Sequence, residues 1–268
     1  MIKCGITGFR GNLGTTFLKV NNDFRYIKFN GDIRKKKQVE NWLKDNKFDI
    51  IIHLAALVPT FKVNNNYQKA LDVNYNGTKH LVGGILKYQK NISWFFFAST
   101  SHVYPFQIKK ISEKNKTKPI SKYGKTKLKA ENYVLKTLKN SNFNFCVGRI
   151  FSIFDNKEKS FFVPSLIKRI KKGTKVMTLE NLHHYRDFLS TKQISKIIFF
   201  LWKKNFSGII NIGSGKKTDL REVAKFVGKK EKKTILFKKN KSTQHIANIT
   251  KLKKLGLKSK KLNFGSFF

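Results

Sequence analysis

The sequence predicts an α/β fold, in which a parallel, doubly wound sheet carries helices on both faces and is followed by a smaller C-terminal lobe. Two observations lead to this prediction. Strand and helix signals alternate from the first residues, as they do where helical crossovers join parallel strands. The segment 49–54 is a nearly continuous apolar run, which is typical of a strand buried on both faces of a parallel sheet.

The first expected strand, residues 2–7, leads directly into a glycine-rich turn. Gly8, Gly11 and Gly14 recur at every third position and open a helix. One glycine permits the tight turn, the next lets the backbone approach a phosphate, and the third packs the helix against the sheet. The N-terminus of the helix then presents free N–H groups to an anion. This segment predicts a Rossmann-type site for the pyrophosphate of a dinucleotide.

The remaining elements follow in chain order. We expect strands at 26–29, 49–54, 92–98 and 143–147, and helices at 36–47, 67–89 and 122–139. The pattern then loosens, with helices expected at 163–171, 191–202 and 219–227 (Thr218 as N-cap of the last) and strands at 175–179 and 208–212. We therefore place a dinucleotide-binding domain at 1–160, with elements returning to it at about 186–212, and a substrate-binding lobe at 161–185 and 213–268.

Composition and charge limit which binding partners and which cellular compartment we expect. The chain has 268 residues and a formal net charge of +42, but its lysines are scattered along the whole sequence without a nucleic-acid-binding motif, which favours a solvated surface. No apolar run is long enough to span a bilayer, and no signal peptide precedes the first strand. Cys4 and Cys146 lie in expected core strands and indicate neither a disulfide nor a metal site. We expect a cytoplasmic protein with no nucleic-acid or membrane partner.

A candidate active site lies on the expected helix 122–139. Tyr123 and Lys127 are four residues apart and therefore share one face. The ordinary pKa of a tyrosine is about 10, and an adjacent ammonium is expected to lower it, so the pair suits a proton shuttle for an alcohol or a ketone. Thr100 follows the expected strand 92–98 at the ligand edge of the sheet, where its hydroxyl would reach the same substrate oxygen. The alternative is a core tyrosine beside a solvated lysine, but the order of glycine turn, hydroxyl and Tyr–Lys pair favours an active site.

Ten segments taken together resemble a known family. They lie at 7–14, 31–33, 53–56, 74–78, 99–104, 121–127, 149–152, 185–189, 210–215 and 249–256, and they span essentially the full length. In these segments the chain resembles the extended short-chain dehydrogenase/reductases, in particular the NAD-dependent epimerase/dehydratase family of nucleotide-sugar enzymes. The resemblance implies an enzyme whose catalytic residues are Thr100, Tyr123 and Lys127. It also implies a homodimer and a nucleotide-diphosphate sugar as substrate.

The resemblance also implies which residues bind the ligands. Substrate-binding roles fall to Thr100, Ser101, His102 and Arg186, of which the arginine would pair with the diphosphate. The alternative for Arg186 is an ion pair with Asp187 or Glu180. The cofactor-binding roles fall to Gly8, Arg10, Gly11, Asn12, Leu13, Gly14, Asp32, Ile33, Leu54, Ala55, Ala56, Asn74, Ser99, Tyr123 and Lys127.

The cofactor and the reaction are narrowed by departures from the family pattern. The strand 26–29 is not closed by the acidic residue that usually binds the ribose 2′-hydroxyl of NAD, and Arg10 could meet a 2′-phosphate, so NADP is preferred to NAD. Ser101 and His102 replace the acidic pair of the dehydratases, which argues against dehydration. A reductase of a nucleotide-linked 4-keto-6-deoxyhexose is favoured over a 4-epimerase with tightly bound NAD. A non-catalytic dinucleotide sensor is a remote alternative, because both Tyr123 and Lys127 are present.

His102 allows a second chemical role. The resemblance places His102 where some relatives carry an acid/base group, with Lys157 near the position of a second such group, and an imidazole that titrates near neutral pH could move a proton at a sugar carbon beside the ketone. The alternative, which is preferred, is a histidine that fixes the loop after the strand 92–98.

Overall fold

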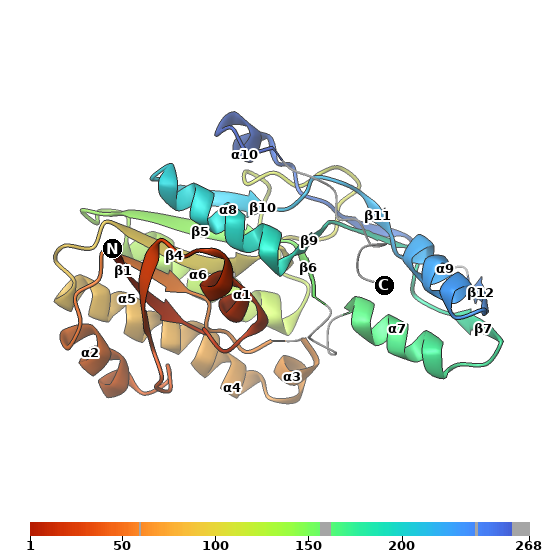
Figure 1. Cartoon of the computed structure of the whole chain (residues 1–268), viewed down its shortest axis with the longest axis horizontal. Helices are drawn as coiled ribbons and strands as arrows, with labels where there is room; N and C mark the ends of the chain where they lie inside the picture. The colour runs from red at the N-terminus through yellow and green to blue at the C-terminus, as the bar shows by residue number, and fades with distance from the viewer. Residues whose placement is uncertain (59, 156–161, 239–240, 259–268) are drawn as a thin grey trace. The chain divides into compact units, whose positions relative to one another are not determined.

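The computed structural model describes residues 1–58, 60–155, 162–238 and 241–258. Its largest sheet has six strands (Figure 1). The strand order is β10-β5-β4-β3-β1-β2, and the pairings from β2 to β5 are all parallel. This confirms the predicted parallel, doubly wound sheet. The strands are β1 (Ile2–Thr7), β2 (Phe24–Lys28), β3 (Ile50–His53), β4 (Trp94–Thr100), β5 (Asn144–Ile150) and β10 (Gly208–Ile212).

The chain forms two compact units. Unit 1 comprises residues 1–105, 116–150 and 191–210, and unit 2 comprises residues 106–115, 151–190 and 211–268.

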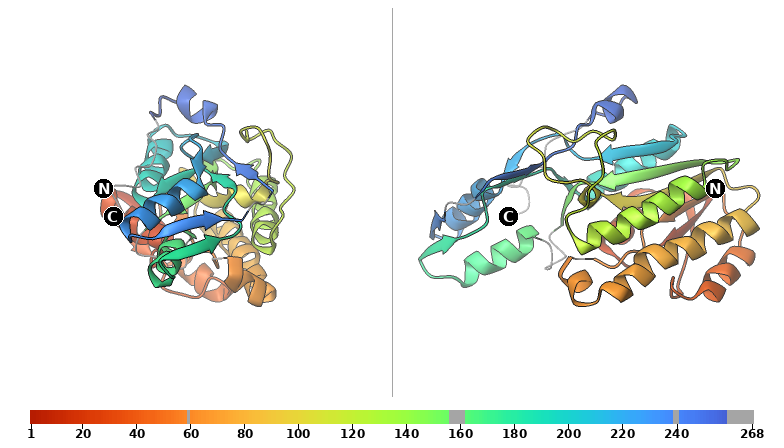
Figure 2. Two further views of the ribbon diagram at one scale, coloured as in Figure 1. Left: turned by 90° about the vertical axis from the view of Figure 1, so that its right-hand side faces the viewer. Right: turned by 180° about the vertical axis from the view of Figure 1, so that it is seen from behind.

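Helices cover both faces of the sheet in unit 1. On one face, α2, α5 and α6 enclose a core that includes Ile51, Phe95 and Phe97 from the strands (Figure 2). On the other face α1 packs against α8, and the hydroxyl of Thr16 donates to that of Thr191 at 3.1 Å. The bounds are α1 (Asn12–Val20), α2 (Lys36–Lys44), α3 (Thr60–Asn65), α4 (Tyr67–Leu71), α5 (Gly77–Tyr88), α6 (Lys122–Thr137) and α8 (Thr191–Lys203).

The helix expected at 67–89 is interrupted by a turn of π-helix, η1 (Asp72–Asn76), between α4 and α5. Asn74 is fully buried in this turn. Its side-chain oxygen accepts a hydrogen bond from the Leu57 N–H at 2.6 Å, and its amide nitrogen donates to the Thr126 hydroxyl at 3.0 Å. A π-turn often marks a functional position, and here it places one side chain between the loop after β3 and helix α6.

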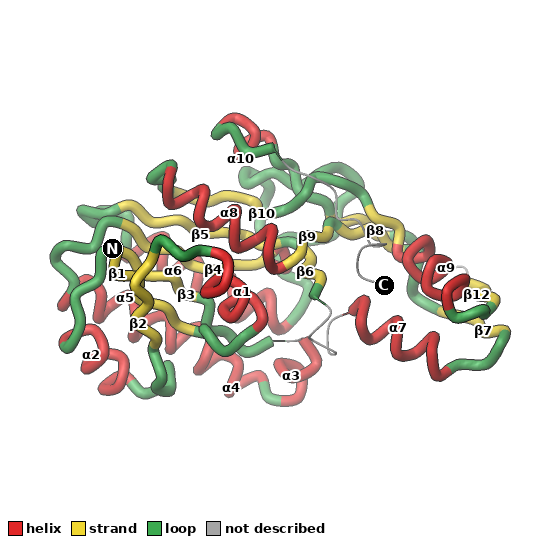
Figure 3. Tube along the Cα trace, in the orientation of Figure 1, coloured by secondary structure: helices red, strands yellow, loops and turns green. Residues whose placement is uncertain are grey.

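Unit 2 is built from short elements, which Figure 3 distinguishes by secondary structure. Helices α7 and α9 pack together against β7 and β12 around a core that includes Phe154, Leu166 and Leu220. The helices are α7 (Phe162–Lys172), α9 (Leu220–Lys230) and α10 (Thr250–Lys254). The strands are β6 (Ser152–Phe154), β7 (Val176–Leu179), β8 (His184–Arg186), β9 (Phe188–Ser190), β11 (Thr218–Asp219), β12 (Thr234–Phe237) and β13 (Thr243–His245).

Two local expectations are wrong. The N-cap of α9 is Asp219, whose carboxylate accepts from the Arg221 N–H at 2.9 Å, and not Thr218, which instead pairs with Arg186 in the short strand β11. The strand expected at 92–98 extends to Thr100, because its ladder with β5 continues to the pair of Thr100 with Ile150. Ser99 and Thr100 therefore sit on the sheet itself.

Candidate active site

The structure brings together Thr100, Tyr123 and Lys127, all within unit 1. Thr100 ends β4, and its side chain forms a hydrogen bond with the Tyr123 hydroxyl. Tyr123 lies in the first turn of α6, and Lys127 lies one turn further along the same helix. Thr100 and Tyr123 are thus in contact, and Lys127 lies on the same helix one turn from Tyr123.

The start of α6 is fixed against the turn η2 (Ser101–Val103), which follows β4. The hydroxyl of Ser121 caps the helix and accepts from the Gly124 N–H at 3.0 Å. A Cβ atom at Gly124 would overlap the carbonyl oxygen of His102, so only glycine permits this close approach. The first turn of α6 is therefore held at the carboxyl end of β4.

Burial governs the acidity of both titratable groups in the pair. Lys127 is only 2% exposed, with its Nζ 4.2 Å from the centre of the Phe97 ring. Burial lowers the pKa of Lys127 to about 7, against an opposing effect of the Glu131 carboxylate. Burial likewise raises the pKa of Tyr123 to about 12, although the Thr100 hydrogen bond opposes this shift. In this state burial outweighs the Thr100 hydrogen bond, so the pKa of Tyr123 lies above its ordinary value and not, as expected, below it.

The glycine turn fits the phosphates of a dinucleotide. Gly8 has a positive φ of 72°, and a Cβ atom there would lie 2.5 Å from the Ala55 nitrogen. Gly11 is the N-cap of α1 and supplies no side-chain cap, so the N–H groups of Asn12 and Leu13 in the first turn face no capping side chain. The Nδ2 atom of Asn12 is buried without a hydrogen-bond partner among the described residues. A turn that requires glycine, an uncapped helix start and an unpaired donor together suit an anionic ligand.

The end of β2 forms the expected place for the adenosine part of the cofactor. A pocket of about 570 Å³ is lined there by residues of β2, the following loop and α2, among them Asn30, Asp32 and Trp42. The Arg10 guanidinium donates to the side-chain oxygen of Asn30 at 3.3 Å. Asp32 forms an ion pair of 2.6 Å with Arg34, whose hydrogen bonds lower the pKa of that carboxyl. Ile33 is buried in the core, so its side chain is less accessible than the resemblance suggests.

Hydrogen bonds that the sequence did not reveal connect the region at the end of β3 to helix α6. Leu54, Ala55 and Ala56 follow the strand, and the Ala55 N–H donates to the Thr7 hydroxyl at 3.3 Å. The buried His53 ring lies between the hydroxyls of Thr7, at 2.6 Å, and Thr78, at 2.9 Å. Burial lowers the pKa of His53 to about 3, so the ring is neutral. Asn74 continues the chain to Thr126, whose hydroxyl donates to the Tyr123 carbonyl at 2.8 Å.

The other residues expected near the substrate have different surroundings. His102 is exposed, with its Nδ1 3.3 Å from the Ser121 hydroxyl and its ring 5.6 Å from the Tyr123 ring. This contact with the cap of α6 agrees with a role in fixing the loop. Ser101 is 3% exposed, and Ser99 donates to a carboxylate oxygen of Glu131. Lys157 lies outside the described residues.

Arg186 belongs to unit 2. Its guanidinium donates to the Tyr185 carbonyl at 2.9 Å and to the Thr243 hydroxyl at 3.2 Å, and it lies 4.9 Å from the centre of the Phe106 ring. Burial lowers the pKa of Arg186 to about 10. Within the described ranges no acidic side chain forms an ion pair with it. Asp187 instead accepts from the backbone of Ser214, Gly215 and Ala247, and Glu180 pairs with Lys238.

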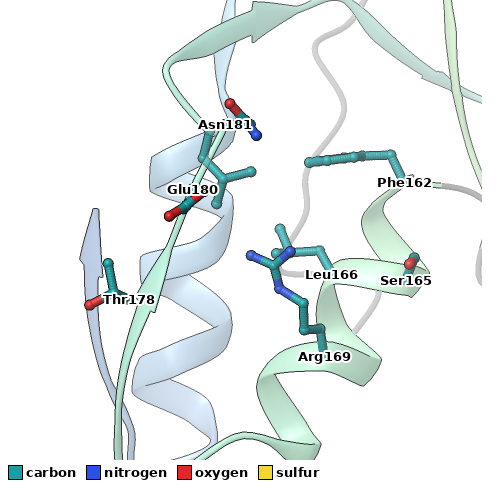
Figure 4. Close-up of a pocket in the computed structure, with 8 residues that line it drawn as sticks. Phe162, Ser165, Leu166, Arg169, Thr178, Glu180 and Asn181 are labelled. Atoms are coloured by element: carbon teal, nitrogen blue, oxygen red, sulfur yellow. The ribbon is translucent and has the colours of Figure 1, made fainter. Parts of the chain in front are cut away.

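Unit 2 also contains a pocket of about 580 Å³ that sequence reasoning did not predict (Figure 4). Phe162, Leu166 and Arg169 line it from α7, and Thr178, Glu180 and Asn181 line it from β7 and the loop that follows. In the described part of the chain, no helix is long and apolar enough to cross a membrane, and no three potential metal ligands are grouped together.

Comparison with known proteins places these features in one family. Residues 6–213 match the model of the NAD dependent epimerase/dehydratase family. The chain is 30% identical over 224 residues to GDP-6-deoxy-D-talose 4-dehydrogenase of Aggregatibacter actinomycetemcomitans, which covers 80% of this chain and 75% of that protein.

Solved structures share the fold at lower identity. RMD from Pseudomonas aeruginosa, complexed with NADPH, superposes with a TM-score of 0.85 at 18% identity and covers 97% of this chain and 94% of that one. UDP-glucose 4-epimerase of Thermotoga maritima, with UDP-glucose, has a TM-score of 0.84 at 19% identity with the same coverage of both chains. The family match spans the glycine turn, Thr100, Tyr123 and Lys127, and the chain is a member of the NAD dependent epimerase/dehydratase family.

Proposed function

We propose that this protein is an NADP-dependent reductase of a nucleotide-linked 4-keto-6-deoxyhexose, with Thr100, Tyr123 and Lys127 as its catalytic residues. The observation that carries the proposal is the placement of the Tyr123 hydroxyl beside Thr100, with the Lys127 ammonium one helical turn away. A relative with 30% identity is named as a 4-dehydrogenase of a GDP-linked 6-deoxy sugar, which is the reverse direction of such a reduction. GDP-linked sugars are therefore the first substrates to test.

The dinucleotide, when bound, supplies a hydride at its nicotinamide ring. Gly8, Gly11 and the start of α1 would hold its phosphates, and the pocket at the end of β2 would take the adenosine. Arg10 stands beside Asn30 at the end of β2, where NAD-preferring members carry an acidic residue, and a guanidinium there suits a 2′-phosphate. This arrangement supports NADP over NAD.

The proton chemistry follows from the acidity of the pair. A Tyr123 pKa of about 12 means that the phenol keeps its proton at neutral pH, so it can donate that proton to the substrate oxygen at C4 during reduction. The Thr100 hydroxyl would hold the same oxygen in line. A protonated Lys127 would then stabilise the phenolate that Tyr123 becomes, because an opposite charge nearby favours the charged form.

Unit 2 would bind the nucleotide part of the substrate. Arg186 supports this role, since its guanidinium is partly desolvated and has no acidic partner among the described residues, and such a group forms strong hydrogen bonds with phosphate oxygens. We also propose the homodimer that the family resemblance implies, which analytical ultracentrifugation would test.

The test is NADPH oxidation by the purified protein with GDP-, dTDP- and UDP-linked 4-keto-6-deoxyhexoses. We expect stoichiometric oxidation with one of them and its loss in Tyr123→Phe. If no sugar supports oxidation, while NAD remains bound through purification and UDP-hexoses are interconverted, the protein is a 4-epimerase. Cofactor binding with no turnover of any sugar would identify a dinucleotide sensor.

A further inference from the structure

A buried ion pair lies directly behind the catalytic lysine. Glu131 follows Lys127 by one turn of α6, on the same face, and is 0% exposed. Its Oε1 accepts from both Nε of Arg149, at 3.0 Å, and Nη2 of the same guanidinium. Its Oε2 accepts from the Ser99 hydroxyl. One carboxylate thus joins the catalytic helix to the two strands β4 and β5.

Arg149 is fixed as firmly as its partner. It is 4% exposed and lies beside Ser99 in the ladder between β4 and β5. Its Nη1 donates to the Tyr104 hydroxyl at 2.6 Å, and its guanidinium lies 4.8 Å from the centre of the same ring. Tyr104 is itself fully buried just after the turn η2. The positions of both charges are therefore set by the surrounding structure, and not by flexible side chains.

Few other titratable groups face Lys127 in the described residues. Tyr123 lies one turn before it on α6, and His53 approaches it from β3. With pKa values of about 12 and about 3, both are neutral from pH 5 to pH 9. The charged groups near the lysine in this range are therefore Glu131 and, behind it, Arg149.

We propose that the Glu131–Arg149 pair sets the proton affinity of Lys127: Glu131 is a positioning residue whose negative charge, one turn along α6, favours the ammonium, and Arg149 is the charge that limits this effect. The lysine ammonium is buried against the Phe97 ring, where an isolated charge is costly. The negative charge of the Glu131 carboxylate, one turn away, lowers the free-energy cost of that buried ammonium. Because the guanidinium of Arg149 offsets the negative charge of Glu131, this carboxylate favours the protonated form of Lys127 less than a lone carboxylate would. The relevance of this device to turnover rests on the proposed function, but the charge coupling itself does not.

The arrangement predicts opposite effects for its two members. Glu131→Gln leaves Lys127 and Arg149 as two buried cations, so Lys127 should lose its proton at lower pH. Arg149→Gln leaves the carboxylate to the lysine alone, so Lys127 should keep its proton to higher pH. Shifts of about one pH unit or more are typical of an opposite or like charge at close range. The double variant Glu131→Gln/Arg149→Gln should return towards the wild-type value.

The experiment is an NMR titration of the lysine side-chain nitrogens in the full chain without substrate, with Lys127→Met used to assign the signal. Glu40→Gln, which alters an ion pair with Lys36 at the same helical spacing on α2, is the matched control and should leave the signal unchanged. We expect the Lys127 midpoint to move down in Glu131→Gln and up in Arg149→Gln. Equal midpoints in all variants, or shifts in the same direction, would overturn the proposal.

Folding and function are controlled separately. If Glu131→Gln does not fold, judged by circular dichroism, Arg149→Gln and the double variant still test the sign of the coupling. For an active wild-type enzyme, the falling limb of the kcat profile at high pH should move in the same directions as the NMR midpoints, whereas a merely structural role would lower kcat without moving this limb. A wild type that reduces no sugar would refute the proposed function while leaving the titration result intact.

Discussion

Unit 1 and unit 2 differ in how their polar groups are used. In unit 1 buried polar side chains form a connected chain that reaches the backbone of Tyr123, along the path from His53 through Thr78 and Asn74 to Thr126. In unit 2 the buried carboxylate of Asp187 binds three backbone N–H groups and the Ser214 hydroxyl, and it holds loops together. On the proposed function, this difference means that unit 1 would place the reacting atoms, and unit 2 would keep short elements in place around the substrate. Variants of the catalytic residues proposed in unit 1 should therefore change kcat, and variants of the substrate-binding residue proposed in unit 2 should change KM.

The largest effect is expected at Tyr123. Tyr123→Phe removes the proton donor and should lower kcat by about 10²- to 10⁴-fold, the usual contribution of general acid catalysis. NADPH binding, followed by fluorescence, should be retained. Tyr133→Phe, also on α6, is the matched control and should leave both quantities unchanged. A kcat near the wild-type value in Tyr123→Phe would contradict the assignment of the proton donor to unit 1.

The second prediction concerns the loss of folding stability that results from burial of the Lys127 charge. Because burial lowers the pKa of Lys127 from its ordinary 10.5 to about 7, the charged form is disfavoured in the folded state. The wild type should therefore lose stability as the pH falls from about 10.5 to about 7 and change little from this cause below it. Lys127→Met should raise the free energy of unfolding at pH 6 by on the order of 2 to 4 kcal/mol, with the gain fading towards pH 10.5. Urea unfolding across this range measures the gap, and a gap that grows with pH would contradict the sign.

Arg186 tests the other half of the comparison. Arg186→Gln should raise KM for the nucleotide sugar by about 10- to 100-fold, because hydrogen bonds to charged groups are worth about 1.5 to 3 kcal/mol. The effect on kcat should be small. Arg169→Gln, in the separate pocket of unit 2, shows whether any arginine of this unit has the same effect. A change confined to kcat would mean that Arg186 acts in the chemical step, and it would contradict the proposed division of roles between the two units.

The smallest effect is expected at Arg10. Arg10→Gln should weaken NADPH binding by about tenfold, through the loss of one exposed charge on the 2′-phosphate, and leave NADH binding unchanged. Dissociation constants for both cofactors measure the difference. Equal losses for both would mean that Arg10 contacts a part that the two cofactors share.

The sequence predicted unit 1 far better than unit 2 for a physical reason. Strands such as Ile50–His53 are buried along their whole length and are joined by helices, so their pattern is visible without knowledge of the fold. Strands of unit 2 such as β11, with two residues, and β8, with three, are too short to show a period. Their pairing depends on contacts between distant segments, such as Thr218 with Arg186.

The candidate site shows the same limit. The helical spacing of Tyr123 and Lys127 could be read from the sequence, and so could the turn at Gly8. The π-turn at Asn74 could not, because it depends on partners at Leu57 and Thr126. The direction of the Tyr123 pKa shift also required the structure, since burial and the Thr100 hydrogen bond act in opposite directions and only the fold shows which is larger.

The most direct test of the central claim is transfer of deuterium from NADPH labelled on the nicotinamide ring to a GDP-linked 4-keto-6-deoxyhexose, followed by mass spectrometry and NMR of the sugar. The proposed reductase should place one deuterium at C4, and Tyr123→Phe should place none. An unlabelled product, formed by a protein that carries its own NAD and interconverts UDP-hexoses, would contradict it.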